Sequence, residues 1–218
     1  MTKEIFTKSY ISSHKEIAEG SFLIGFKRDF EFKAGQIIGI AIEENGPRRL
    51  YSICSGEKDS DILILYKRVE KGVLTPQLSD LQIGDPIWIT EPRGTFISDD
   101  HPHTWIATGT GIAPFYSMLR SGKTKDVILL HGERDEKMFY FQKEFKELLG
   151  DNYIRCSSTE TSENFYTGRV SYYMLDIKVL DTKRKYYLCG SAEMVVEVRD
   201  ILISRGVSFE DIISEIYF

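Results

Sequence analysis

Cysteine is scarce in this sequence, and the few cysteines present are far apart. The 218 residues contain three of them, Cys54, Cys156 and Cys189, and none stands in a CxxC pair. An odd number of isolated cysteines argues against a disulfide framework, and their spacing argues against a cysteine-held metal site or iron–sulfur cluster. Any redox chemistry would therefore need a cofactor that is held without cysteine ligands.

The sequence also lacks a long apolar run and a surplus of positive charge. No stretch of about 18 apolar residues occurs, and the opening MTKEIFTKSY lacks the apolar core of a secretory signal. We therefore expect a cytoplasmic protein with no membrane association. The net charge of -5 argues against general nucleic-acid binding, because no basic excess is present to neutralise phosphates. The four histidines form no convincing ligand set, so we expect no metal site.

Short β-like runs separated by turn signals fill the chain from residue 6 to about 97. Turn-forming stretches such as NGP, GEKDSD and IGDP lie between these runs. Many short strands with little helix predict an antiparallel barrel or sandwich. The predicted strands are residues 21–28, 36–44, 48–54, 61–69 and 86–90.

From Thr104 onward, strands and helices alternate, which is typical of an α/β domain with a parallel sheet. The polar stretch 98–103 is the expected linker. Two helices show an apolar stripe, one through Phe141, Phe145, Leu148 and Leu149, the other through Met194, Val195, Val198, Ile201 and Leu202. The predicted strands of this half are residues 104–109, 126–132, 153–158 and 185–190.

The stretch RRLYSICS, residues 48–55, carries unusual side chains for a strand. With a side-chain period of two, Arg49 and Tyr51 share one face, whereas Leu50 and Ser52 point to the other. A cation beside an aromatic ring suits an anionic ligand with a flat ring. The alternative is a solvated strand whose tyrosine covers the end of a barrel.

Two glycine-bearing stretches follow predicted strands of the second half, ATGTGIAP at 107–114 and LCGSAEM at 188–194. Glycines permit close approach of the backbone to a phosphate, and a helix N-terminus offers free N–H groups. The spacing is not the GxGxxG pattern, and a tight strand-to-helix turn would use the same residues. At the chain end, Tyr217 and Phe218 are expected to cover something, either a ligand or the protein's own sheet.

Taken together and in this order, these stretches resemble the ferredoxin–NADP reductase family and its related flavin reductase modules. The resemblance covers essentially the whole chain and implies an antiparallel FAD-binding β-barrel domain over 1–98, followed by an α/β parallel-sheet NAD(P)-binding domain over 99–218. The stretches that carry it are FEFKAGQ (30–36), RLYS (49–52), EKGVLTPQL (70–78), GTGIAP (109–114), CGS (189–191) and EIY (215–217).

The resemblance implies an enzyme, an FAD-dependent reductase of the ferredoxin–NAD(P) type. It would transfer hydride between NAD(P)H and FAD and pass single electrons to ferredoxin or flavodoxin, which it would bind transiently as a monomer. One alternative is an NADH-dependent flavin reductase component that serves an oxygenase or a cytochrome. Another is a noncatalytic flavin- or nucleotide-binding module that regulates a partner. FMN in place of FAD also stays open.

The resemblance further implies roles for residues around the flavin. Arg49 would pair with the pyrophosphate, Tyr51 and Tyr217 would lie against the two faces of the isoalloxazine, and Ser52 would hydrogen-bond near its N5 atom. The expected catalytic residues are Ser52, Cys189, Glu215 and Tyr217. The expected FAD-binding residues are Arg49, Leu50, Tyr51, Ser52, Gly72, Val73, Leu74, Thr75, Tyr217 and Phe218.

For the nucleotide, the resemblance implies NADP(H), with NAD(H) as the alternative. Bacterial relatives that use NADP carry an arginine after the position of Ser158, where this chain has Thr159. Arg134 and Arg169 fall where other phosphate-binding arginines of those relatives lie, and Arg155 or Lys143 could assist. The expected NAD(P)-binding residues are Thr108, Gly109, Thr110, Gly111, Arg134, Ser158, Thr159, Arg169, Cys189 and Gly190.

Overall fold

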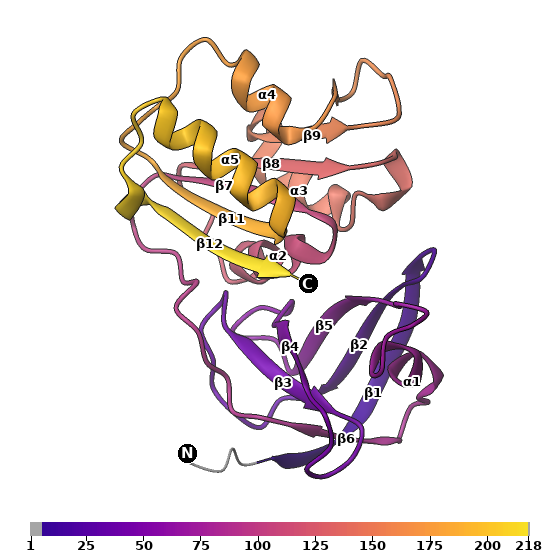
Figure 1. Ribbon diagram of the computed structural model, residues 1–218. Coiled ribbons are helices and arrows are strands. Elements are labelled where there is room, and N and C mark those ends of the chain that lie inside the picture. The colour runs from indigo at the N-terminus through magenta and orange to yellow at the C-terminus, as the bar shows by residue number, and fades with distance from the viewer. Residues whose placement is uncertain (1–5, 218) are drawn as a thin grey trace. The chain divides into compact units, whose positions relative to one another are not determined.

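The computed structural model describes residues 6–217, which divide into two compact units (Figure 1). Unit 1 contains the chain up to Ile97 together with Tyr116–Ser121. Unit 2 contains Ser98–Phe115 and the chain from Gly122 onward. No helix within the described range is long and apolar enough to cross a membrane.

Unit 1 is built on a six-stranded antiparallel sheet with the strand order β4-β3-β6-β1-β2-β5 (Figure 1). The two ends of the sheet meet at an isolated bridge between Ile53 and Ile64 and at a 2.8 Å bond from the Cys54 amide to the Leu63 carbonyl. The sheet is therefore barrel-like without being a closed barrel. Its elements are β1 (Thr7–Ala18), β2 (Ser21–Lys27), β3 (Ile37–Ala41), β4 (Arg49–Ser52), β5 (Asp61–Lys67), α1 (Thr75–Asp80) and β6 (Pro86–Ile89).

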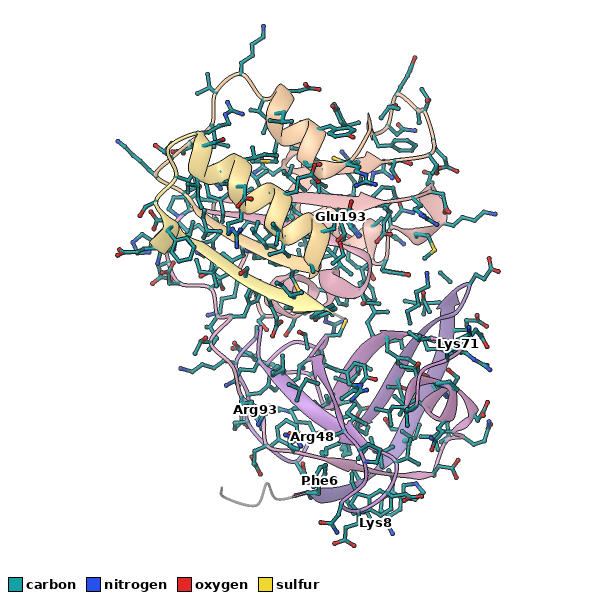
Figure 2. All side chains as sticks on the ribbon, in the orientation of Figure 1. Phe6, Lys8, Arg48, Lys71, Arg93 and Glu193 are labelled. Atoms are coloured by element: carbon teal, nitrogen blue, oxygen red, sulfur yellow. The ribbon has the colours of Figure 1, made fainter. Side chains whose placement is uncertain are left out.

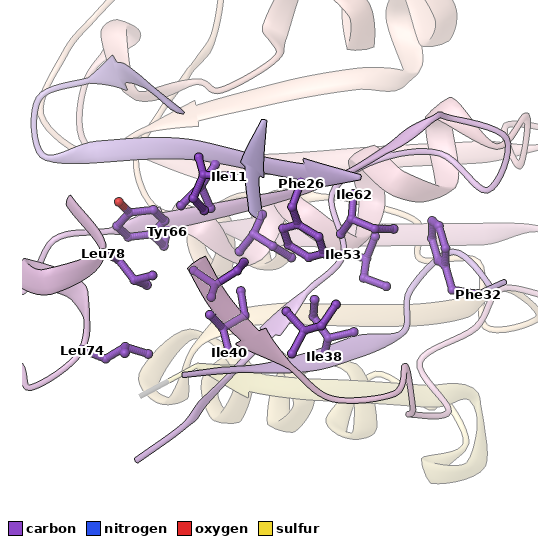
Figure 3. Close-up of a cluster of buried hydrophobic side chains, with 14 residues drawn as sticks. Ile11, Phe26, Phe32, Ile38, Ile40, Ile53, Ile62, Tyr66, Leu74 and Leu78 are labelled. Atoms are coloured by element: carbon purple, nitrogen blue, oxygen red, sulfur yellow. The ribbon is translucent and has the colours of Figure 1, made fainter. Parts of the chain in front are cut away.

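The inward faces of these strands form one apolar core, shown in Figure 3. Alternate positions contribute to it, such as Ile38 and Ile40 from β3 and Ile62 and Ile64 from β5, because successive side chains of a strand point to opposite faces. Leu78 of α1 belongs to the same cluster. The antiparallel fold predicted for the first half is thus confirmed.

Strand β1 is the strand of unit 1 that the sequence did not predict. Its pairing with β2 is irregular between Ile11 and Ser13 and again between Glu16 and Ala18. Each irregularity shifts the side-chain alternation by one residue, so no period-two pattern runs through the strand. Only Ile11 of its twelve residues is buried, which removes the apolar signal as well.

Unit 2 is a parallel sheet with the strand order β10-β9-β8-β7-β11-β12 and helices on both faces. The predicted α/β fold of the second half is confirmed. Its strands are β7 (His103–Thr108), β8 (Val127–Glu133), β9 (Tyr153–Ser157), β10 (Tyr166–Thr167), β11 (Lys185–Ser191) and β12 (Ile212–Tyr217). Its helices are α3 (Gln142–Leu149), α4 (Val170–Asp176) and α5 (Ala192–Ser204), together with the start of α2 (Ala113–Arg120).

Both faces of the parallel sheet are apolar and covered. On one face, Ile106 and Leu188 pack with side chains of α4 and α5 in a single cluster. On the other, Trp105 stacks on Phe115 of α2 at 5.4 Å between ring centroids. Adjacent residues of β7 thus serve opposite layers, which explains why this strand reads as a continuous apolar run.

Helix α3 departs from the predicted stripe at one position. Phe145 and Leu149 are buried as expected, but Leu148 is 58% exposed. Phe141 is the N-cap residue and has a left-handed backbone with φ 57°. A helix of eight residues buries only a narrow i, i+4 line, so the flanking leucine faces solvent.

The polar segment 98–103, predicted as a linker, is tied to the start of β11. The Asp99 carboxylate accepts hydrogen bonds from His103 Nε2 at 3.0 Å, from the His101 amide at 3.0 Å and from Lys185 Nζ. Burial alone would raise the pKa of Asp99, but these donors together hold it well below its usual range. Burial also lowers the pKa of His103, against the effect of Asp99. No group of three or more metal-ligating side chains occurs among residues 6–217.

Candidate functional site

Strand β4 presents Arg49 and Tyr51 on the same face. It pairs with β3 in the register Ile40 to Arg49 and Ile38 to Tyr51. Directly opposite residues of paired strands point to one face, so both side chains lie on the side of the buried isoleucines. The predicted alternation is confirmed. Arg49 is exposed at the start of the strand, whereas Tyr51 is half-buried against the core.

The Tyr51 hydroxyl is buried and has no hydrogen-bond partner within the described chain. Burial, followed by the neighbouring Tyr66, raises the pKa of the Tyr51 phenol. Its ring meets Tyr66 edge-on at 6.4 Å between centroids. A buried, unsatisfied hydroxyl costs about 1–3 kcal/mol, a penalty that a bound ligand with a polar group can remove. Unit 1 thus offers a cation, an aromatic ring and an unused hydroxyl from one short strand.

The other residues predicted to hold the flavin lie beside β4 or before α1. Leu50 is 48% exposed, and Ser52 is buried at the end of the strand. The turn at 72–75 is held by its own bonds, since the Gly72 amide donates to the Val69 carbonyl at 2.7 Å and the Thr75 hydroxyl accepts from the Val69 amide at 2.9 Å. Val73 is exposed, and Leu74 is buried in the core. The roles of these residues at a flavin stay predictions.

In unit 2 the two glycine-bearing turns meet at the carboxyl edge of the sheet. Strands β7 and β11 are parallel neighbours, with Ala107 opposite Cys189, so both turns leave the same edge. A Cβ on Gly111 would lie 2.7 Å from Gly190 Cα and closer still to the Cys189 carbonyl. Gly190 has φ +150°, and a Cβ there would lie 2.9 Å from the Thr108 carbonyl oxygen. Each turn therefore requires glycine because the other turn lies against it.

The same edge carries an unused polar group and open space. The Thr108 hydroxyl is buried and has no hydrogen-bond partner within the described chain. Gly109 follows with φ +58°, and nothing lies within 4 Å of the position where its Cβ would be. Thr110 and Gly111 complete a 3-10 turn that leads into α2. Backbone N–H groups at such a turn favour an anionic ligand, and the free space leaves room for a phosphate.

Cys189, Glu215 and Tyr217 come together where β11 pairs with β12. Cys189 lies opposite Glu215, and Ser191 lies opposite Tyr217. Burial, and then the Glu215 carboxylate, raises the pKa of the Cys189 thiol well above its usual value, against a hydrogen bond with the Tyr217 side chain. The thiol therefore stays protonated at neutral pH and is not a nucleophile.

The chain end forms part of the sheet, because β12 docks along β11 as a parallel edge strand through Tyr217. The prediction that the terminal aromatic side chains cover a ligand is not tested by this pairing. Phe218 lies outside the described residues.

The predicted nucleotide-binding residues after β8 and β9 are joined by a network of hydrogen bonds. The Arg134 carbonyl accepts from the Ser157 hydroxyl at 2.7 Å, from the Thr159 amide at 3.2 Å and from the Thr159 hydroxyl. The Ser158 amide donates to the Glu133 carbonyl at 3.0 Å. These bonds hold the two loops against each other at the carboxyl edge.

Arg169 pairs with a residue that the sequence analysis did not select. Its Nη1 atom donates to Glu193 Oε1 at 2.6 Å. Glu193 lies in the first turn of α5, two residues after the capping Ser191. An acidic residue after a CGS turn was visible in the sequence, but its partner stands 24 residues away, and only the packing of α4 beside α5 brings the two together.

Comparisons with known proteins agree with this architecture. The family model described as "Oxidoreductase NAD-binding domain" matches residues 105–200. A flavodoxin/ferredoxin–NADP reductase of Rhodobacter capsulatus is 27% identical over 218 residues, which cover 86% of this chain and 81% of the relative. The electron transfer component of toluate 1,2-dioxygenase from Pseudomonas putida is 23% identical over 94% of this chain. The chain spans 66% of that component's length, just under two thirds.

Among solved structures, a ferredoxin NADP+ reductase from Neisseria gonorrhoeae with bound FAD and NADP has a TM-score of 0.89 at 21% identity. The alignment covers 99% of this chain and 100% of that chain, and at this identity the likeness concerns the fold. By its matched NAD-binding domain, the reductases among its relatives and its fold, this chain is similar to the ferredoxin–NADP reductase family.

Proposed function

We propose that this protein is an FAD-dependent oxidoreductase that takes hydride equivalents from NAD(P)H and passes electrons singly to a protein carrier. The observation that carries the proposal is that Tyr51 in unit 1 and Thr108 in unit 2, which is one of three such residues there, each hold a buried, unpaired hydroxyl next to predicted ligand-binding residues. Each stands beside residues suited to one of the two ligands.

In unit 1 the residues present fit a flavin dinucleotide. The Arg49 guanidinium is exposed, planar and permanently charged, so it can pair with a pyrophosphate. Tyr51 offers its ring to a flat tricycle and its unused hydroxyl to a polar atom. FAD, when bound, would supply a carrier that accepts two electrons together and releases them one at a time. The protein's part is to bind and orient it.

In unit 2 the residues present fit the phosphates of a pyridine nucleotide. The Thr108 hydroxyl and the amides after Gly109 would bind the phosphates, while Gly111 and Gly190 let the backbone approach them. Cys189 would contribute a neutral thiol that packs beside the nicotinamide, and Glu215 a carboxylate that orients it. The bond between Cys189 and Tyr217 would hold these groups in place.

The carrier that receives the electrons is proposed to be a ferredoxin or a flavodoxin, bound transiently by a monomer. The Rhodobacter relative is named for both carriers. A reductase component that serves an oxygenase is the second candidate, because the Pseudomonas relative is the electron transfer component of a dioxygenase. Thr159, which stands where NADP-using bacterial relatives have an arginine, and the pairing of Arg169 with Glu193 favour NADH, the nucleotide of this second candidate.

Rapid-mixing measurements of flavin reduction test the proposal. The purified protein should be yellow, release FAD on denaturation, and bleach under argon when mixed with NADPH or NADH. The Arg49→Gln variant should lose FAD more readily than Arg48→Gln, which removes the same charge one residue earlier, where the side chain lies against Gly39. A colourless protein that binds no added flavin, or a flavin that neither nucleotide reduces, would contradict the proposed function.

A further inference from the structure

An ion pair joins two helix N-termini at the carboxyl edge of the unit 2 sheet. Arg169 is the residue that precedes α4, and Glu193 lies in the first turn of α5. Their side chains meet through a 2.6 Å bond between Arg169 Nη1 and Glu193 Oε1. Glu193 is labelled in Figure 2. The pair is solvent-accessible, with side-chain exposures of 52% and 73%, so a ligand at this edge would meet both charges.

Glu193 lies at the start of a helix, where an acidic side chain is favourable. The positive end of the α5 dipole favours a carboxylate in the first turn of the helix. Ser191 caps the same turn by accepting from the Met194 amide at 3.3 Å, which fixes the start of the helix. The carboxylate in turn raises the pKa of Arg169 through their hydrogen bond and its charge.

The neighbouring arginine that could replace Arg169 is already engaged. Arg155 donates to Gln142 at 2.7 Å and to the Asn164 carbonyl at 3.1 Å, and its guanidinium lies over the Phe139 ring at 5.6 Å. It also approaches Glu136 at 3.7 Å. Because of these contacts, the Arg155 guanidinium is engaged by the loops after β8 and β9 and is not free to bind a ligand.

Of the three candidate arginines, Arg134 is the one whose guanidinium is not engaged. Its carbonyl is bound by Ser157 and Thr159, but its exposed guanidinium has no partner within the described chain. At the position after Ser158 the chain supplies a threonine whose hydroxyl is tied to this same carbonyl. Among the candidate 2′-phosphate ligands, the edge therefore offers one unpaired arginine and one arginine neutralised by the Glu193 carboxylate.

This arrangement of charges should affect the binding of NADPH and of NADH differently. A 2′-phosphate needs cations and is repelled by a carboxylate, whereas a ribose 2′-hydroxyl can donate to one. We propose that Glu193, through its ion pair with Arg169, is a specificity-determining residue that makes this protein prefer NADH to NADPH. The proposal rests on the proposed function and concerns the same nucleotide site.

Direct binding of the two oxidised nucleotides tests the proposal. The probes are NAD+ and NADP+, titrated calorimetrically into the FAD-loaded protein and into its Glu193→Gln variant. Removing the carboxylate frees Arg169, and an exposed charge pair is worth a few-fold in affinity, so the ratio of NADP+ to NAD+ affinity should rise about fivefold. The matched control is Glu197→Gln, which removes the same charge one turn along α5. Glu197 acts on Arg169 only through its charge, as the last and weakest contribution, so its ratio should change less than about twofold.

A double-mutant cycle with Arg169→Gln identifies the pair. In the wild-type background this change should alter the affinity ratio less than about twofold, because Arg169 is already neutralised. In the Glu193→Gln background it should remove the whole gain. An unchanged ratio in Glu193→Gln, an equal rise in Glu197→Gln, or a gain that survives Arg169→Gln would each overturn the proposal. Failure of the proposed function would appear differently, as a flavin that neither NADH nor NADPH reduces in rapid-mixing experiments.

Discussion

Replacing Gly111 by alanine should destabilise unit 2 through a collision between its two glycine turns. The added Cβ would lie 2.7 Å from Gly190 Cα and closer still to the Cys189 carbonyl. These are backbone atoms, so no side-chain rotation relieves the contact, and the start of α2 must move from the end of β11 by roughly 1 Å to reach an ordinary contact distance. Overpacking of this kind costs about 1–3 kcal/mol, and we expect the upper end of that range.

Gly109→Ala is the matched control, two residues earlier in the same turn. Nothing lies within 4 Å of its added Cβ, but φ is +58°. Its cost is therefore conformational strain alone, about 1 kcal/mol for a single left-handed residue. The difference between the two variants isolates the collision.

The sequence contains two tryptophans, one in each unit. Tryptophan fluorescence during urea unfolding can therefore give the unfolding free energy of one unit when the tryptophan of the other is replaced. Trp105 is fully buried in β7 of unit 2, and Trp88 lies in β6 of unit 1. A Trp88→Phe background leaves Trp105 as the reporter of unit 2. Equal losses in Gly111→Ala and Gly109→Ala, or no loss in Gly111→Ala, would refute the packing of the two turns described above.

Two further predictions concern the unpaired hydroxyl and the Asp99 cluster. Tyr51→Phe should raise the unfolding free energy of flavin-free unit 1 by about 1–3 kcal/mol, because it removes a buried hydroxyl that has no partner, while weakening FAD binding. Tyr66→Phe should instead cost about 1 kcal/mol, because that hydroxyl bonds His14 Nε2 at 2.9 Å; equal losses by Trp88 fluorescence would exclude this account. Burial lowers the pKa of His103 in the folded protein. As pH falls through about 6.5, the unfolded chain therefore protonates at His103 before the folded chain does, and unit 2 should lose stability as pH falls further. The His103→Gln variant should show a weaker dependence between pH 7 and 5, and an unchanged slope would contradict the assignment.

The sequence indicated most of the elements correctly because the relevant signals are local. Alternation along residues 48–54 placed Arg49 and Tyr51 on one face without knowledge of the fold, since the pleat of a strand is set by its own backbone. Continuous apolar runs predicted β7, β8, β9 and β11 of unit 2, because a parallel sheet is covered on both faces, but the edge strands β10 and β12 were not predicted. Strand β1 was not predicted because its bulges interrupt the period-two alternation of side chains.

Contacts between distant residues were decided by the tertiary structure alone. The order of strands puts β11 beside β7, and this neighbourhood is what forces Gly111 against Cys189 and leaves the Thr108 hydroxyl unpaired. In the same way, Lys185 reaches Asp99 across 86 residues. The sequence indicated Arg169 as a candidate phosphate ligand from its residue type and position. Its pairing with Glu193, which lies on α5, was visible only in the structure. The sequence determines which chemical groups the chain carries, whereas the packing of the helices and strands determines which charges and hydrogen-bond partners surround each group.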